Sequence, residues 1–346
     1  MDVLSDVLRV IRLSGAIFFN AEFTAPYAIA SPPPPRLAAR LLPVTECLAI
    51  FHVLVQGDTW VVVDGEAHLR MEQGDVIIFP HSHPHVMTSR VGTEPTSLDG
   101  LLPAAGPDGF PHLSFGGGGA LTRFVCGYLA CDQRFNPLMG ALPALLCVRR
   151  RPEGVTLETP GSESERRRIP LPADAAGWLT TTLEYLQAEV AALQPGSRAM
   201  LARLAELLYV EVLRRYAHHL PVGQTGWLAG LNDPQVGQAL RLLHADPAEA
   251  WTVNTLARAA GVSRSALASR FTELIGESPI HYLTAWRMHL ARQLLQENRF
   301  TIPDIAARVG YASEAAFHRA FKRSVGVPPG RWTKTAANHG QASQAA

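Results

Sequence analysis

The hydrophobic pattern of the first 170 residues predicts short β-strands. Apolar runs, alternating or continuous, recur along this part of the chain. Turn signals such as Gln56 to Asp58 and Gln73 to Asp75 separate them. Many short strands at this spacing indicate a sandwich or barrel. The expected strands are Ala16–Phe19, Cys47–Val55, Thr59–Val63, Ala67–Met71, Val76–Phe79 and Leu121–Tyr128.

The pattern then changes to a helical period. Ala173 to Leu193 and Ser197 to Leu220 each carry apolar residues at three- and four-residue spacing, which predicts two amphipathic helices. The apolar face of the second helix is broader than packing on one barrel requires. The segment from Pro221 to Asn232 contains glycine and is expected to be a linker.

A pattern of helix, tight turn and second helix occurs twice between Val253 and Trp332. In each copy a glycine that tolerates positive φ, Gly261 or Gly310, ends the first helix. A serine, Ser263 or Ser313, then occupies the expected N-cap of the next helix. The copies are offset by 49 residues at the glycine and 50 at the serine, so they form an internal repeat. This is the helix-turn-helix pattern, whose second helix enters the DNA major groove.

One long helix is predicted between the copies. Pro279 suits a first helical turn, and Ile280 to Gln296 contains no further proline or glycine. Seventeen residues span about 25 Å, which suits a strut that holds two recognition helices about one DNA turn, ~34 Å, apart. The alternative is an ordinary helical bundle with repeated corners.

The charge distribution supports the DNA-binding interpretation. The chain has 346 residues, enough for two or three domains, and a net charge of +1. Asp233 to Ala346 contains 13 basic and 8 acidic residues, whereas the remainder contains 18 and 22. The positive excess therefore coincides with the repeat, as attraction to phosphate requires.

Other compositional features predict a cytoplasmic protein. No run of 18 uncharged apolar residues is present, so no membrane span is expected, and the N-terminus has no secretory signal pattern. Four cysteines in a chain of this size do not indicate a disulfide framework, and reduced thiols are expected.

The residues around the repeat resemble the AraC/XylS family of bacterial transcription regulators. The matching positions are Gly276, Pro279, Tyr282, Leu283, Arg287, Ala291, Leu294, Phe317, Phe321, Gly326 and Pro329. The chain departs from the family at Trp332-Thr333, where the family usually has Tyr-Arg. The resemblance implies double-stranded DNA and RNA polymerase as partners. It also implies that the two amphipathic helices pair subunits in a homodimer, the alternative being that they only cap the barrel.

The resemblance also implies which side chains meet DNA. In the first recognition helix Ser265, Ala268 and Ser269 are expected to face bases, with Arg264 and Arg270 flanking or on phosphate. Ser and Ala offer weak contacts, so this helix is expected mainly to position the protein. In the second helix Arg319 suits a guanine, although a phosphate contact or an internal ion pair is the alternative. The remaining positions in the second helix are Glu314, Ala315, His318, Lys322 and Arg323.

The stretch from His52 to Met87 resembles the cupin barrel found at the N-terminus of AraC-type regulators. Gly74-Asp75, Pro80 and His85 follow the second cupin motif, with Ser82 in place of its usual glycine. The first cupin motif, which supplies metal ligands, is not recognisable, so enzyme chemistry is not expected. The expected effector-binding residues are His52, Trp60, His81, His83, His85 and Cys126.

Two further properties of this region stay open. The alternating residues His81, His83 and His85 would share a face on an extended segment and, with His52 or Cys126, would suit a divalent metal. The alternative is a hydrated polar loop. A relative of this architecture senses reactive chlorine through a cysteine aligned with Cys126, which suggests redox sensing. The alternative is that all four cysteines are buried hydrophobes.

The sequence therefore predicts an α+β multidomain protein. The expected parts are a cupin-like sensor domain (1–170), a helical dimerisation and connector region (171–232), a DNA-binding domain with two helix-turn-helix units (233–335) and a disordered tail (336–346). The expected function is a DNA-binding transcription regulator controlled by a signal sensed in the cupin-like domain. A redox- or metal-responsive regulator is the alternative, and a cupin enzyme is the least favoured interpretation.

Overall fold

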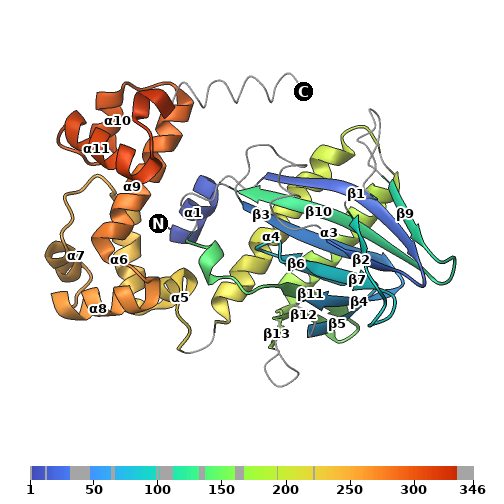
Figure 1. Cartoon of the computed structure of the whole chain (residues 1–346). Helices are drawn as coiled ribbons and strands as arrows, with labels where there is room; N and C mark the ends of the chain where they lie inside the picture. Colours follow the sequence, from blue (N-terminus) through green and yellow to red (C-terminus); the bar gives the residue numbers. More distant parts are fainter. Residues whose placement is uncertain are drawn as a thin grey trace. The chain divides into compact units, whose positions relative to one another are not determined.

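The computed structural model describes residues 2–11, 14–31, 47–63, 67–98, 101, 112–131, 137–159, 167–192, 194–220 and 223–332. The expected tail 336–346 lies outside these residues. The chain forms two compact units (Figure 1). We call Leu13–Gln133 with Leu142–His219 the β-unit, and Met1–Arg12 with Arg134–Ala141 and Leu220–Ala346 the helical unit.

The β-unit consists of an eight-stranded and a five-stranded sheet. The strand order is β13-β12-β11-β6-β3-β10-β1-β9 in the first and β5-β4-β7-β2-β8 in the second. All six strands expected from the sequence are confirmed. The strands are β1 Ser14–Thr24, β2 Ala28–Ala30, β3 Cys47–Gln56, β4 Asp58–Val63, β5 Ala67–Glu72, β6 Val76–Phe79, β7 His85–Thr88, β8 Thr96–Ser97, β9 His112–Gly116, β10 Leu121–Cys131, β11 Leu146–Arg151, β12 Gly154–Glu158 and β13 Arg168–Pro170.

Alternation along the strands produces the core of the β-unit. In β4, Thr59, Val61 and Val63 are buried, whereas the residues between them are more exposed. The buried side chains of both sheets form one apolar cluster, which includes Phe19, Phe79 and Phe124. The interior of this cupin-like unit is therefore filled largely with hydrophobic side chains.

Two long helices pack against the β-unit, as expected. The helices are α3 Ala173–Ala192 and α4 Ser197–His218, and they contact each other, with α4 lying against β1 and α3 against β12. Each buries one leucine-rich face. Their outward faces are described below, because they bear on subunit pairing.

The helical unit contains the predicted repeat. Its helices are α1 Val3–Ile11, α5 Trp227–Asn232, α6 Pro234–Ala245, α7 Val253–Ala259, α8 Arg264–Ile275, α9 Pro279–Glu297, α10 Ile302–Arg308 and α11 Glu314–Val325, with the short 3₁₀ helix η2 Met139–Ala141. The strut predicted between the copies is α9, and α6 is a support helix that precedes the first copy.

Three segments of the helical unit differ from the expected domain boundaries. The 221–232 segment, expected as a linker, contains helix α5, and Trp227 Nε1 donates a hydrogen bond to Tyr282 Oη at 3.0 Å. Two segments from the first 170 residues also pack here: α1 against α6 and α9, and η2 against α5. Burial of Val3 and Val7 explains why α1 is a helix, because its apolar side needs a partner surface.

Candidate nucleic-acid interface

The first helix-turn-helix unit is α7 and α8, and its termini are capped locally. Thr252 and Thr255 form a reciprocal capping box at the start of α7. Gly261 has φ 72° in the turn, and the Ser263 hydroxyl accepts a hydrogen bond from Ala266 N at the start of α8. These caps confirm the sequence prediction of helix, glycine turn and serine N-cap.

The second unit is α10 and α11, and it repeats the same design. Thr301 and Asp304 form the capping box, Gly310 has φ 80° in the turn, and Ser313 caps α11 by accepting from Ala316 N. Both units bury their equivalent apolar residues, namely Leu256, Ala257, Leu267, Phe271, Ile305, Ala306, Phe317 and Phe321.

Helix α9 joins the two units. At its N-terminal half, the Tyr282 ring lies 5.9 Å from the Phe271 ring of α8. At its C-terminal half, Met288, Ala291 and Leu295 share an apolar cluster with α10 and α11. Figure 1 shows α8 and α11 at opposite ends of α9. The nineteen residues of α9 correspond to about 28 Å of helix.

The second helix-turn-helix unit and α9 also contact the loop between α6 and α7, which precedes the first helix-turn-helix unit. A Cβ added to Gly310 would lie 2.5 Å from the carbonyl oxygen of Ala248, so only glycine fits there. Arg287 of α9 donates hydrogen bonds to the carbonyls of Pro247 (2.6 Å) and Glu249 (2.7 Å). Desolvation on burial lowers the pKa of Arg287. The relative orientation of the units is therefore held by α9 and by this contact.

Three of the five candidate residues of α8 are small; the other two are arginines, and one of these, Arg270, is already in ion pairs. Arg264, Ser265 and Ser269 are exposed, and Ala268 is half-buried. Arg270, expected to flank the bases or bind phosphate, donates to Asp233 Oδ2 at 3.1 Å and pairs with Glu273 Oε2 at 3.1 Å. Because Asp233 caps α6, Arg270 ties α8 to the support helix.

The candidate residues of α11 offer more chemistry. Glu314, Ala315, Arg319, Lys322 and Arg323 are exposed. His318 is half-buried, and its Nε2 lies 3.4 Å from Glu314 Oε1. Among the residues that the structure describes, Arg319 makes no ion pair, so the expected alternative of an internal pair is not seen there. Helix α11 therefore exposes guanidinium, ammonium and carboxylate groups.

Three of the six candidate effector residues form a buried chain in the β-unit. His52 Nδ1 lies 3.0 Å from Cys126 Sγ, and its Nε2 lies 2.9 Å from His85 Nε2. His85 Nδ1 lies 2.8 Å from the carbonyl oxygen of His83. Desolvation lowers the pKa of His85 to about 4 and lowers that of His52 well below its usual value, so both rings are neutral.

Because both rings are neutral, the hydrogen bonds that join Cys126, His52, His85 and the His83 carbonyl can run in only one direction. The His83 carbonyl accepts, so His85 Nδ1 carries hydrogen and His85 Nε2 accepts from His52. His52 Nδ1 then accepts from the Cys126 thiol. Burial raises the pKa of Cys126 far above its usual value. These hydrogen bonds therefore give the buried side chains of His52, His85 and Cys126 the polar partners that they need.

Of the three alternating histidines, His85 does not share a face with His81 and His83, whose ring centroids lie 5.7 Å apart. Ser82 has φ 53°, which turns the chain between His81 and His83, and β7 begins only at His85. His81 Nε2 lies 3.2 Å from the carbonyl of Leu142, whereas His85 points into the core. Within the described ranges, no three His, Cys, Asp or Glu side chains converge as metal ligands. Of the two interpretations left open for this segment, the polar loop therefore agrees better with the described residues.

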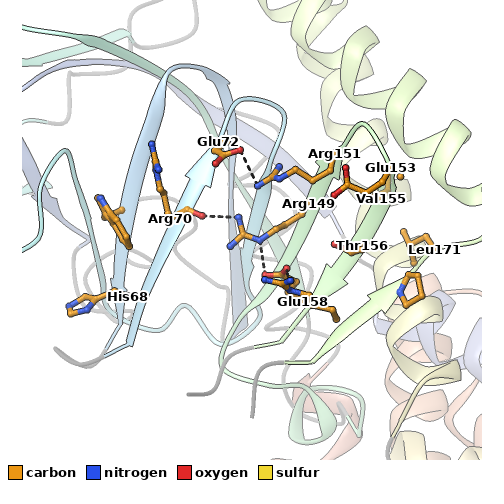
Figure 2. A pocket seen from close by; sticks show the side chains of 14 residues that line it. His68, Arg70, Glu72, Arg149, Arg151, Glu153, Val155, Thr156, Glu158 and Leu171 are labelled. Atoms are coloured by element: carbon orange, nitrogen blue, oxygen red, sulfur yellow. Dashed lines mark hydrogen bonds and ion pairs between the residues drawn. The ribbon is translucent and has the colours of Figure 1, made fainter. Parts of the chain in front are cut away.

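The remaining candidate, Trp60, lines a charged pocket that the sequence analysis missed (Figure 2). The pocket contains arginine and glutamate side chains from β5, β11, β12 and β13. The run Arg149 to Arg151 was a possible signal, because charged residues ending an apolar strand are unusual in a buried position.

Comparisons with known proteins agree with this architecture. A cupin family model matches residues 2–168 and 167–218, and a helix-turn-helix domain model matches residues 256–335. A putative AraC-like transcription regulator of Streptomyces lividans is 34% identical over 286 residues, 82% of this chain and 86% of the relative. A second one, of Streptomyces antibioticus, is 31% identical over 336 residues, 96% of this chain and 99% of the relative.

A third relative is the RCS-specific HTH-type transcriptional activator RclR of Escherichia coli K12, 31% identical over 332 residues, 96% of this chain and 97% of the relative. Among the helices of the described residues, none has the length and apolar character that crossing a bilayer requires. These relatives are transcription regulators rather than enzymes. The chain therefore belongs to the AraC family of transcription regulators with an N-terminal cupin domain, and it binds DNA through its helix-turn-helix units.

Proposed function

We propose that this regulator reads a duplex site composed of two blocks about one helical turn apart, and that a small molecule bound by the β-unit controls it. The observation that carries the first part is the contrast between the two recognition helices. On α8, Ser265 and Ser269 are exposed and Ala268 is half-buried, so this helix offers only small side chains at the positions expected to face bases. On α11, the charged side chains of Glu314 and Arg319 are exposed. Helix α8 then positions the protein, and α11 supplies most of the sequence selectivity.

In this proposal each exposed group of α11 has its own role. Arg319 donates two hydrogen bonds to a guanine, and Glu314 near the helix start accepts from a cytosine amine. Lys322 and Arg323, in the last turns of α11, bind phosphate together with Arg264 of α8. Arg270 acts through its ion pair with Asp233 and holds α8 in place.

A small-molecule signal fits the β-unit better than oxidation of Cys126. Thiol oxidation proceeds through the thiolate, and burial of Cys126 raises its pKa and removes it from solvent. Cys147 is also buried, with its pKa raised to about 12 by the same cause. The RclR relative is named RCS-specific, but the thiols described in this chain lack the exposure of a redox sensor.

Subunit pairing through α3 and α4 completes the proposal. In the described part of the chain, four of the five exposed large hydrophobic side chains lie on these two helices. Trp178 and Tyr185 are seven residues apart on α3, and Met200 and Leu207 are seven apart on α4. Each pair is on one side of its helix, which suits burial against a second copy of the chain. The proposal is therefore a homodimer paired through α3 and α4, which acts with RNA polymerase on cytoplasmic DNA.

A selection experiment tests the DNA part of the proposal. The full chain is incubated with a pool of random duplexes, and the bound fraction is sequenced. We expect an enriched motif with one strongly and one weakly selective block, centred about 10 base pairs apart. Affinity for it should fall steeply with added salt. A single block, or two equally selective blocks, would contradict the assigned roles of α8 and α11.

A further inference from the structure

The charged pocket of the β-unit has the size of a ligand site. It has a volume of about 540 Å³ and lies beside β5, the last strand of the five-stranded sheet. Its other walls come from the outer strands of the eight-stranded sheet (Figure 2). Small-molecule sites commonly occupy 300–1,000 Å³. None of the residues in the buried His52–Cys126–His85 chain lines it.

Strand register explains why charged side chains gather in this pocket. Arg149 and Arg151 alternate with Arg150 on β11, so they share a face. Across the sheet Arg149 is opposite Thr156, which is opposite Pro170 of β13. Glu158 is likewise opposite Arg168. One continuous polar face thus runs over β11, β12 and β13.

Two buried carboxylates hold the arginines of this face in place. Asp75, fully buried, accepts from Arg149 Nη1 at 3.1 Å and from Arg151 Nη1 at 2.7 Å. Glu158, 3% exposed, accepts from Arg149 Nε at 2.6 Å and pairs with Arg168 Nε at 3.0 Å. Arg149 Nη1 also donates to the carbonyl of Arg70 on the edge strand β5. The floor is therefore rigid and nearly neutral.

The rim of the pocket exposes charges of both signs, and three of these groups are themselves in ion pairs: Arg168 with Glu158, Arg70 with Asp58 at 3.2 Å, and Glu72 with Arg151 at 3.4 Å. The side chain of Arg168 is 71% exposed, that of Arg70 is 55% and that of Glu72 is 51%. Glu153, in the turn between β11 and β12, is exposed and makes no ion pair with any described residue. Trp60, half-buried, is opposite Arg70 in the β4–β5 pair and adds a flat apolar surface.

This arrangement selects against ligands with a single charge. An anion attracted by the arginines meets the Glu72 and Glu153 carboxylates, and a cation attracted by these carboxylates meets Arg70 and Arg168. We propose that the pocket binds a small zwitterion of the amino-acid class. Its carboxylate pairs with the rim arginines, its ammonium group with the rim carboxylates, and its side chain lies against Trp60. This inference rests on the proposed control of the regulator by a small molecule.

The position of the pocket links an occupant to the proposed dimer helices. Leu171 lines the pocket, and α3 begins two residues later at Ala173. On the opposite face of β11, Arg150 pairs with Glu184 of α3 at 3.0 Å. A ligand that contacts β11, β12 and Leu171 therefore acts on the strands and the segment that support α3. Binding is expected to alter subunit pairing and, through it, DNA affinity.

Calorimetric titration of the full chain with three matched probes tests the proposal. The probes are L-phenylalanine, the cation 2-phenylethylammonium, which lacks the carboxylate, and the anion 3-phenylpropanoate, which lacks the ammonium group. We expect L-phenylalanine to bind at least about tenfold more tightly than either analogue, a difference of about 1.4 kcal/mol. Equal binding of one analogue, or no binding of L-phenylalanine, would overturn the assignment to a zwitterion.

Variants at the exposed rim locate the site. Glu153→Gln and Arg168→Gln should each weaken L-phenylalanine binding at least about fivefold. Arg123→Gln removes a similarly exposed arginine of β10, outside the pocket, and should leave it unchanged. Unaltered binding in both rim variants would place the ligand elsewhere. Titration without DNA keeps this test separate from duplex selection, so either proposal can fail alone.

Discussion

The guanidinium carbon of Arg287 lies 5.8 Å from the centroid of the Tyr311 ring. Arg287 belongs to α9 and Tyr311 to the turn of the second helix-turn-helix unit, while the hydrogen bonds of Arg287 reach the loop before the first unit. One side chain therefore touches all three parts that determine how α8 and α11 are presented. Arginine suits this position because it donates several hydrogen bonds and stacks on an aromatic ring.

Replacing Arg287 with alanine should make the relative orientation of the two helix-turn-helix units less fixed. Two charge-assisted hydrogen bonds disappear, and we expect a loss of about 2–3 kcal/mol in the free energy of unfolding. Binding to a two-block duplex should weaken at least about tenfold, because the ideal spacing is no longer enforced. Chemical denaturation and duplex titration measure these effects. Arg299→Ala, at an exposed position just after the end of α9, is the matched control. Equal losses on one-block and two-block duplexes would show that Arg287 stabilises without orienting.

Arg319→Ala and Lys322→Ala should affect DNA binding in different ways. Loss of a bidentate guanine contact costs about 1–3 kcal/mol at one base pair and relaxes selectivity there. Loss of a phosphate contact weakens all duplexes alike and lowers the slope of log affinity against log salt by about one. Measuring both variants on all single-base substitutions of the selected site separates the two roles. Uniform weakening by Arg319→Ala would assign it to phosphate.

Leu207→Asp should separate the subunits. Leu207 is 54% exposed, and its burial in a dimer contributes about 2 kcal/mol for each copy. A symmetric dimer contains two copies, so the dissociation constant should rise by roughly three powers of ten. Analytical ultracentrifugation measures this change. Val91→Asp alters an exposed apolar residue on a different segment and should leave the assembly intact. Similar changes in both variants would place the interface elsewhere.

The buried His85 should make stability depend on pH. Its pKa is lowered to about 4 by desolvation, whereas the unfolded chain protonates this residue near the ordinary 6.5. Above pH 6.5 His85 is neutral in both the folded and the unfolded state, so its contribution to stability is fully present. As the pH falls from 6.5 towards 4, His85 is protonated in the unfolded state but not in the folded state, so the free energy of unfolding decreases. Between about pH 7.5 and 5.0 the loss from this residue amounts to about 2 kcal/mol.

Two histidine variants isolate this contribution. The fall in unfolding free energy should be smaller in His85→Gln by about 2 kcal/mol, because the group that titrates is removed. His218→Gln, at an exposed position on α4, should follow the parent protein. Denaturant titrations at several pH values provide the comparison. The buried neutral state of His85 is refuted if both variants keep the full pH dependence.

Local patterns explain why so much of the helical unit was predictable. Gly261 and Gly310 turn the chain at positive φ, and Ser263 and Ser313 cap the following helices, as the repeat predicted. Each cap involves residues within three positions of one another, so a short stretch of sequence is enough to recognise it. The same holds for strands such as β4, where alternation over six residues identifies the buried face.

Distant partners explain what the sequence analysis missed. The 221–232 segment contains α5 because Trp227 finds Tyr282, 55 residues later. The arginines of β11 enter a partly buried pocket because Asp75, more than seventy residues earlier, compensates their charge. His85 does not converge with His81 and His83 because Ser82 turns the chain and His52 holds His85 in the core.

The amino-acid sequence alone thus determined the family architecture, the repeat and most of the secondary structure, because capping and hydrophobic periodicity act over a few residues. Tertiary structure decided which charged and polar groups are available. In the folded protein Arg270 forms an ion pair, Cys126 forms a buried hydrogen bond, and Arg287 binds the loop that precedes the first helix-turn-helix unit. The energy of such a pair depends on the partner and on how deeply the pair is buried. These partners are distant in the sequence, and only folding brings them together.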